Sequence, residues 1–151
     1  MPVIFEPTLV KASYIEGLNN TGGNHEVEWD FGINEGAKIE KVVITPAQSQ
    51  GVAGTMEAGL NFRPNAGSPA ASGDIFQDDD VFCSAMSLAC VAAGSYSNVV
   101  FDFQKDSIYV VKDITGQYFS SGASNKAAYI KIYYKRCRFS DAEMGNLLRN
   151  Y

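Results

Sequence analysis

The segment AYIKIYYKRCRFSDAEM, residues 128–144, contains two different periodicities. In its first half apolar residues alternate with residues that can face solvent, which predicts a half-buried antiparallel strand. The predicted inward set is Ala128, Ile130, Ile132 and Tyr134, and the predicted outward set is Tyr129, Lys131, Tyr133 and Lys135. In its second half Ser140 is followed three residues later by Glu143, a capping box that predicts the start of a helix.

The predicted helix occupies residues 140–151 and carries an apolar stripe. Its apolar residues recur at spacings of three and four, as expected of an amphipathic helix, at Met144, Leu147, Leu148 and Tyr151. A helix this short does not persist alone in water, so its stripe needs a surface to cover it. That surface belongs either to the chain's own sandwich or to a neighbouring molecule.

Four other segments also alternate with a period of two, and three weaker ones fill the gaps. The four are residues 25–33 with Val27, Trp29, Phe31 and Ile33 inward, 54–63 with Met56, Ala58, Leu60 and Phe62 inward, 98–104 with Val99, Phe101 and Phe103 inward, and 107–115 with Ile108, Val110 and Ile114 inward. The weaker ones are residues 9–15, 38–45 and 81–91, of which the last could form a short helix but is interpreted as a strand because its neighbours are strands. Loop-type clusters at 19–23, 34–36, 94–95 and 120–122 separate them.

This pattern predicts a fold class. About eight strands occur at regular spacing with no long helical pattern between them, which argues against parallel βαβ architectures. We therefore predict one all-β domain over residues 1–151, an antiparallel β-sandwich of jelly-roll type with a short C-terminal helix. The longest irregular stretch, residues 63–74, is predicted to be either a functional or a disordered loop. Residues 1–7 are predicted to be either an N-terminal arm that reaches a neighbour or an edge strand of the same domain.

The charge of the chain is uneven. Residues 126–151 hold six basic and two acidic residues, a net charge of +4, whereas the remaining residues hold six basic and fifteen acidic ones, a net charge of −9. An acidic body argues against nucleic acid as the main partner. The asymmetry favours either a head-to-tail contact between copies or simply a solvated basic strand.

Residues with catalytic or metal-binding chemistry are sparse. The single histidine is His25, and the three cysteines, Cys83, Cys90 and Cys137, have neither disulfide-framework nor zinc-site spacing. The run Asp78–Asp80 lacks the spacing of a calcium loop and is interpreted as a solvated turn. We therefore expect no enzyme activity, no metal and no cofactor.

The ends of the sequence carry no recognisable targeting signal. The first residues lack a basic region followed by an apolar one, and no apolar run approaches the ~20 residues of a membrane span. The protein is therefore expected to be made and folded in a cytoplasm.

The segment AAYIKIYYKRCRFSDAEMGNLL, residues 127–148, resembles the C-terminal part of small virion structural proteins of bacterial and archaeal DNA viruses. The layout of short strands is similar as well. The resemblance implies a virion subunit, that is, a capsid, decoration or spike-base protein that binds other copies of itself or other virion proteins. It carries no diagnostic motif, so it assigns no functional residue.

Two functions remain open from the sequence. A virion subunit would make its contacts through candidate interface residues at both ends of the chain and on the last strand: Ile4, Phe5, Tyr129, Lys131, Tyr133, Lys135, Arg136, Arg138, Met144, Leu147, Leu148 and Tyr151. Tyrosine is favoured at protein contacts, although a stripe of tyrosine and lysine also suits single-stranded nucleic acid. The alternative function is a carbohydrate-binding or receptor-binding β-sandwich.

Overall fold

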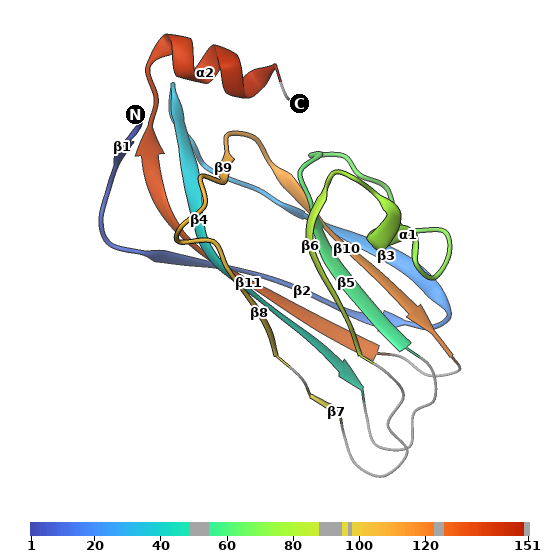
Figure 1. Ribbon diagram of the computed structural model, residues 1–151. Helices are drawn as coiled ribbons and strands as arrows, with labels where there is room; N and C mark the ends of the chain where they lie inside the picture. The colour runs from blue at the N-terminus through green and yellow to red at the C-terminus, as the bar shows by residue number, and fades with distance from the viewer. Residues whose placement is uncertain (49–54, 88–94, 97, 123–125, 150–151) are drawn as a thin grey trace.

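A computed structural model describes residues 1–48, 55–87, 95–96, 98–122 and 126–149. In chain order its elements are β1 (Val3–Ile4), β2 (Leu9–Leu18), β3 (Thr21–Val27), β4 (Glu35–Gln48), β5 (Thr55–Asn61), α1 (Asp74–Gln77), β6 (Val81–Ser87), β7 (Ser95–Tyr96), β8 (Val99–Asp102), β9 (Tyr109–Val110), β10 (Ile114–Ser121), β11 (Lys126–Arg138) and α2 (Asp141–Leu148). The strands form two antiparallel sheets packed face to face, and α2 lies across one end of the sandwich (Figure 1).

The strand order defines the fold. In sheet A, β11 lies between β2 and β4, β1 extends the β2 edge, and β7, β8 and β9 pair in succession with the other side of β4. Sheet B has the order β3-β10-β5-β6. If β7, β8 and β9 are counted as one interrupted strand and β1 is not counted, the strands can be renumbered 1 to 8 in chain order. The order of the strands is then 1-8-3-6 in sheet A and 2-7-4-5 in sheet B. This is the order of a jelly roll, so the predicted fold class is confirmed.

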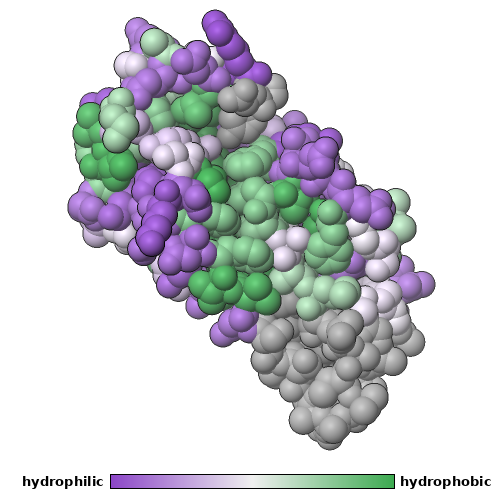
Figure 2. All heavy atoms as spheres, viewed as in Figure 1, coloured by the Kyte–Doolittle hydropathy of each residue, from purple (hydrophilic) through white to green (hydrophobic). Residues whose placement is uncertain are grey.

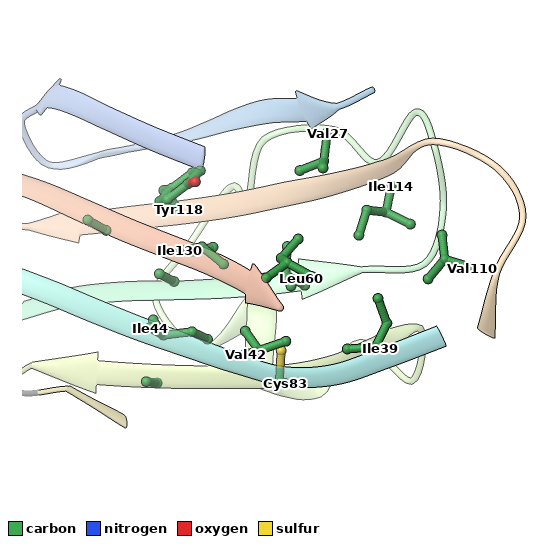
Figure 3. Packing of buried hydrophobic residues seen from close by; sticks show 14 of the residues in the cluster. Val27, Ile39, Val42, Ile44, Leu60, Cys83, Val110, Ile114, Tyr118 and Ile130 are labelled. Carbon is green, nitrogen blue, oxygen red and sulfur yellow. The ribbon is translucent and has the colours of Figure 1, made fainter. Parts of the chain in front are cut away.

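The core lies between the inner faces of the sheets (Figure 3). The predicted inward residues of β11 are buried, and Ile130 and Ile132 are completely so. Their counterparts from sheet B include Leu60 and Ile114, which are also fully buried. The Tyr118 hydroxyl shares a 2.6 Å hydrogen bond with Ser13 of the opposite sheet, which satisfies the one polar atom that this large side chain brings into the core.

The segment predicted as a strand over residues 25–33 is a strand only in part. Strand β3 ends at Val27, because Val27 pairs with Ile114, the first residue of β10, and no ladder partner lies beyond it. Trp29 and Phe31 follow in irregular chain that crosses between the sheets, and they pack on the core from one end. Ile33, which alternation places inward, is 91% exposed at the tip of a turn.

Strand β3 also starts earlier in the sequence than predicted. Its first residues lie in the glycine-containing cluster 19–23 that predicted a loop, and the turn itself is confined to the two asparagines before Thr21. A Cβ on Gly22 would lie 1.9 Å from the carbonyl oxygen of Pro69, so this glycine permits a close approach of backbone rather than a turn. A second departure affects residues 107–115, predicted as one strand, which divide between β9 in sheet A and β10 in sheet B.

The outer face of sheet B is covered by residues 63–80, which we call the strap. Sequence alternation places Glu57, Gly59 and Asn61 in solvent, but all three are buried beneath it. The strap is attached by side chains of sheet B: Gln117 donates to the carbonyl oxygen of Gly67 (2.8 Å), Thr115 donates to that of Arg63 (2.7 Å), and Glu57 accepts from the backbone N–H of Gly73 (2.9 Å). The loop predicted to be functional or disordered is therefore part of the fold, and the short helix α1 within it was not predicted.

The contact between Gly22 and the strap gives a stability prediction. We expect Gly22→Ala to lower the free energy of unfolding by about 1–3 kcal/mol, because the added methyl group forces the Pro69 carbonyl away from β3. The matched control is Gly67→Ala in the same strap, where an added Cβ meets nothing within 4 Å. Chemical denaturation of both variants would measure the difference, and equal stabilities would contradict a tightly seated strap.

Candidate interaction surfaces

The structure brings the two ends of the chain together. β1 pairs with the end of β11, with Ile4 opposite Cys137. The backbone N–H of Phe5 donates to the carbonyl oxygen of Arg136 (2.8 Å), and the guanidinium of Arg138 lies 5.7 Å from the centre of the Phe5 ring. Of the two predicted alternatives for residues 1–7, the structure places them along the edge of their own sheet.

The basic residues of this region are paired with acidic groups of the same chain. The Lys135 ammonium lies 2.7 Å from a carboxylate oxygen of Glu6. The carboxylate oxygens of Glu35 form ion pairs with guanidinium nitrogens of Arg136, at 2.9 Å, and Arg138, at 3.5 Å. Hydrogen bonds from Arg136 and from the backbone N–H of Gly32 hold the pKa of Glu35 below its ordinary value. A large part of the predicted basic end is thus neutralised locally, which reduces the charge available to a second copy.

The lowered pKa of Glu35 predicts a pH dependence of stability. A carboxyl group with a depressed folded-state pKa stabilises the fold above its unfolded-state pKa, and this contribution is lost as the pH falls through the folded-state value. We therefore expect the unfolding free energy to decrease on acidification below about pH 4 more steeply in the wild type than in Glu35→Gln. Denaturation curves between pH 7 and pH 3 would measure this, with exposed Glu28→Gln as the control. A variant slope equal to that of the wild type would contradict it.

Helix α2 is well capped but poorly covered. The Ser140 side chain accepts from the backbone N–H of Glu143, and the Glu143 carboxylate accepts from the backbone N–H of Ser140, so the predicted capping box is confirmed. The Asn34 side chain also donates to Asp141 (2.6 Å) at the start of the helix. Even so, no residue of α2 is buried, and Leu148 of its apolar stripe is 41% exposed.

Other large apolar side chains are exposed at this same end of the sandwich. The turn that presents Ile33 is joined to the start of α2, because the backbone N–H of Phe139 donates to the Asn34 carbonyl oxygen (2.7 Å). We call the following exposed set the α2 end: Val3 (61%), Ile4 (39%), Phe5 (40%), Ile33 (91%) and Leu148 (41%). Phe139 itself is buried, with its ring edge-on to Tyr109, and it closes the core beneath the helix.

A second surface lies on the outer face of sheet A. Cross-strand pairing aligns Tyr14 with Tyr129, and the rings stack with centroids 4.7 Å apart. Lys131 lies two residues after Tyr129 on the same face of β11 and pairs with Val43 of β4. Val43 in turn pairs with Val100 of β8. Lys131 is exposed and has no hydrogen-bond or ion-pair partner among the residues that the structure describes.

The twelve candidate interface residues therefore divide between two surfaces. Seven lie at or next to the α2 end: Ile4, Phe5, Arg136, Arg138, Met144, Leu147 and Leu148. Four lie on the outer face of sheet A: Tyr129, Lys131, Tyr133 and Lys135. Tyr151 is outside the described residues, and for all twelve a role in contacts stays a prediction. Sequence reasoning missed Ile33, because alternation places it inward and its exposure depends on where the strand pairing stops. Val100 was not singled out, although alternation with Val99 and Phe101 inward already places it on the outer face.

A band of hydrophobic residues also crosses the side of the molecule where β8 and β6 form the edges of the two sheets (Figure 2). A row of aromatic rings closes the core here: Phe62 stacks on Phe82 with centroids 4.2 Å apart, and Phe103 lies 6.3 Å from both Phe82 and Phe101. All four side chains are partly buried and pack on the core. We interpret this row as the lateral wall of the core.

One open depression lies between β2 and β3. Its volume is about 450 Å³, and it is lined by Lys11, Ala12, His25, Glu26, Val27 and Glu28. The lining is largely polar and no aromatic ring contributes to it. The Lys11 ammonium lies 5.1 Å from the centre of the Trp29 ring, so this lysine is attached to the end of the core.

The residues considered for catalysis or metal binding are dispersed. His25 is exposed, and among the described residues no acid or nucleophile is hydrogen-bonded to it. Burial raises the pKa of both Cys83 and Cys137 to about 12, with the charge of Glu143 adding to the effect at Cys137. Cys90 is outside the described residues. No group of metal-binding side chains occurs within the described ranges, and Arg63 bridges Asp78 and Asp80.

Comparison with known proteins gives distant structural likenesses. No family model matches the sequence, and no curated protein is significantly similar to it. The chain is similar to a crystal structure of decameric BFDV capsid protein, with a TM-score of 0.41, 9% identity and coverage of 90% of this chain and 99% of that one. It is also similar to the 60-mer of BFDV capsid protein, with a TM-score of 0.39, 7% identity and coverage of 91% and 94%.

These likenesses have a narrow meaning. The TM-scores are low, so the jelly roll is defined by this chain's own strand order. The matched proteins come from a circovirus, and nothing in them supports the narrower expectation of a bacterial or archaeal virus. No helix in the described part of the chain is long and apolar enough to cross a membrane.

Proposed function

We propose that this chain is a structural subunit of a viral particle, either a capsid protein or a capsid-associated protein such as a decoration or spike-base protein. It acts by assembling with further copies of itself or by binding other virion proteins. The jelly roll is a fold of viral capsid domains, although lectins and cupins share it, so the fold alone does not select the function. The choice of a virion role over other jelly-roll functions rests on helix α2.

The observation that carries the proposal is the partial covering of α2: none of its residues is buried, Met144 and Leu147 are half-buried, and Leu148 is exposed. Eight residues are too few for a helix to persist alone in water, and α2 has no extensive contact with any described strand. Its fixed start, at the Ser140 capping box and the Asn34–Asp141 hydrogen bond, orients the helix without covering it. A helix that is held in place with Leu148 exposed is suited to contact a neighbour.

The rest of the α2 end supports the same role. Exposed apolar side chains from three separate parts of the chain, at Val3 to Phe5, at Ile33 and at Leu148, lie at the same end of the sandwich. Several exposed apolar side chains at one end of a domain are a feature that contact surfaces share. We assign the α2 end as a contact between copies of this chain, since the virion subunit proposed here must meet its own copies repeatedly.

A carbohydrate-binding or receptor-binding module is the second candidate, and the depression between β2 and β3 favours it. Its volume of about 450 Å³ falls within the range of small-molecule sites. Its lining of charged residues without an aromatic platform makes it a weaker basis than the α2 end. A glycan array separates the two functions: reproducible binding that His25→Ala abolishes would favour the module.

The first test is the solution mass of the purified chain, by light scattering after size exclusion, with negative-stain images of any large fraction. A defined oligomer, ring or shell is the expected outcome. A monomer at every accessible concentration, without binding to any preformed particle, would contradict the proposal.

Removal of α2 gives a sharper prediction. Truncation after Phe139 keeps all strands and the buried Phe139, which closes the core beneath the helix, so we expect a folded domain whose assembly is weakened. Far-ultraviolet circular dichroism and thermal melting check the fold, and light scattering checks assembly. A truncated chain that fails to fold would show instead that the helix belongs to the core, and Leu148→Asp would then test the contact in a folded protein.

A substitution that stabilises α2 is expected to strengthen assembly. Gly145 is exposed within α2 and an added Cβ would meet nothing within 4 Å. Gly145→Ala should stabilise the helix by about 1 kcal/mol and raise the assembly constant by several fold if α2 binds its neighbour as a helix. Gly67→Ala, in open space within the strap, is the matched control. An unchanged assembly constant would contradict docking of a helical α2.

A further inference from the structure

The outer face of sheet A has features of a second contact surface, separate from the α2 end. Around Lys131 it presents the stacked Tyr14 and Tyr129 on one side and Val43 with Val100 on the other. Val100 is 56% exposed, and the two tyrosines are each about two-fifths exposed, at 41% and 42%. At its centre this surface combines tyrosine and valine side chains with Lys131.

Lys131 determines which kind of partner surface the outer face of sheet A can bind. Its neighbour Lys41 is held over the Tyr133 ring at 4.2 Å, whereas Lys131 has no partner within the described residues. In a two-fold contact each residue meets a surface identical to its own, so a face-to-face pair centred on Lys131 would bring two ammonium groups together. Like charges in a contact cost several kcal/mol, so this face disfavours its own copy and favours a surface that bears carboxylates.

The same chain carries such a surface on the opposite side of the sandwich. The strap holds one arginine and four aspartates, so its net charge is 1 − 4 = −3. Arg63 forms ion pairs with Asp78 and Asp80. Asp79, between them, is exposed and has no ion pair among the described residues. Phe76 of α1, three residues before it, is 44% exposed and offers an aromatic anchor of the kind that dominates protein contacts.

The strap is also rigid. Besides its attachment to sheet B, it is held internally by Asp74, whose carboxylate accepts from the backbone N–H groups of Ala70 (3.0 Å) and Ala71 (2.9 Å). A preorganised segment loses little conformational entropy on binding. The strap can therefore present Phe76 and Asp79 in a fixed arrangement.

We propose that the outer face of sheet A binds the strap of a second copy, with Asp79 opposite Lys131 and Phe76 against the tyrosine and valine side chains. This inference rests on the proposed function, since it names a second contact between subunits. Because the two surfaces lie on opposite sides of one sandwich, the contact is head-to-tail, and such contacts build rings or extended arrays.

Charge reversal tests the contact directly. Lys131→Glu and Asp79→Lys should each weaken association, by about tenfold or more in dissociation constant, because each variant sets like charges against each other. An equimolar mixture of the two variants should recover association, since every contact in an alternating array then pairs opposite charges. The double variant in one chain should recover it as well, and 0.5 M salt should weaken the wild type.

Controls separate this contact from the α2 end. Lys105→Glu makes the same charge change at an exposed lysine between β8 and β9 and should leave association unchanged. Phe76→Ala should weaken association without altering charge, and thermal melts establish that every variant is folded. If the wild type assembles and Lys131→Glu assembles equally well or better, this inference is wrong while the proposed function stands. A wild type that never assembles contradicts the proposed function itself.

Discussion

The pairing of β11 on both of its edges is the constraint on which the rest of the structure depends. β11 pairs with β4 along nearly its whole length on one side, and with β2 and then β1 on the other. Its inner face supplies Ile130 and Ile132 to the core, and its outer face supplies Lys131 to a solvent-facing surface. Its last residues place α2 at the end of the sandwich. A single alternating strand thus fixes the core and both candidate contact surfaces.

Features that depend on local sequence could be predicted. Alternation in residues 128–134 and the Ser140–Glu143 capping box involve neighbours in the chain, so the period of the strand and the start of the helix are fixed by nearby residues. The fold class followed from many such strands without intervening helices. Burial of Tyr118 with its partner Ser13, 105 residues away, had no local signal.

Features that depend on the neighbouring strand could not be predicted. Trp29, Phe31 and Ile33 continue an alternating pattern, yet the ladder stops at Val27 because β10 begins at its partner Ile114. Glu57 alternates outward and is nevertheless buried, because the strap lies over it. One of its carboxylate oxygens has no hydrogen-bond partner among the described residues. A buried carboxylate with a single hydrogen bond contributes little stability, so its effect is to fix where the strap lies.

The two sheets differ in how their outer faces are treated, and this difference has consequences for assembly. Sheet B is covered by its strap, which carries a net negative charge, whereas sheet A leaves tyrosine, valine and lysine side chains in solvent. A sandwich with unlike faces has a direction, and directional subunits pack front to back unless a separate two-fold contact intervenes. The α2 end is a third surface, distinct from both faces. A closed shell needs more than one kind of contact between its subunits, and the three unlike surfaces proposed for this jelly roll would supply them.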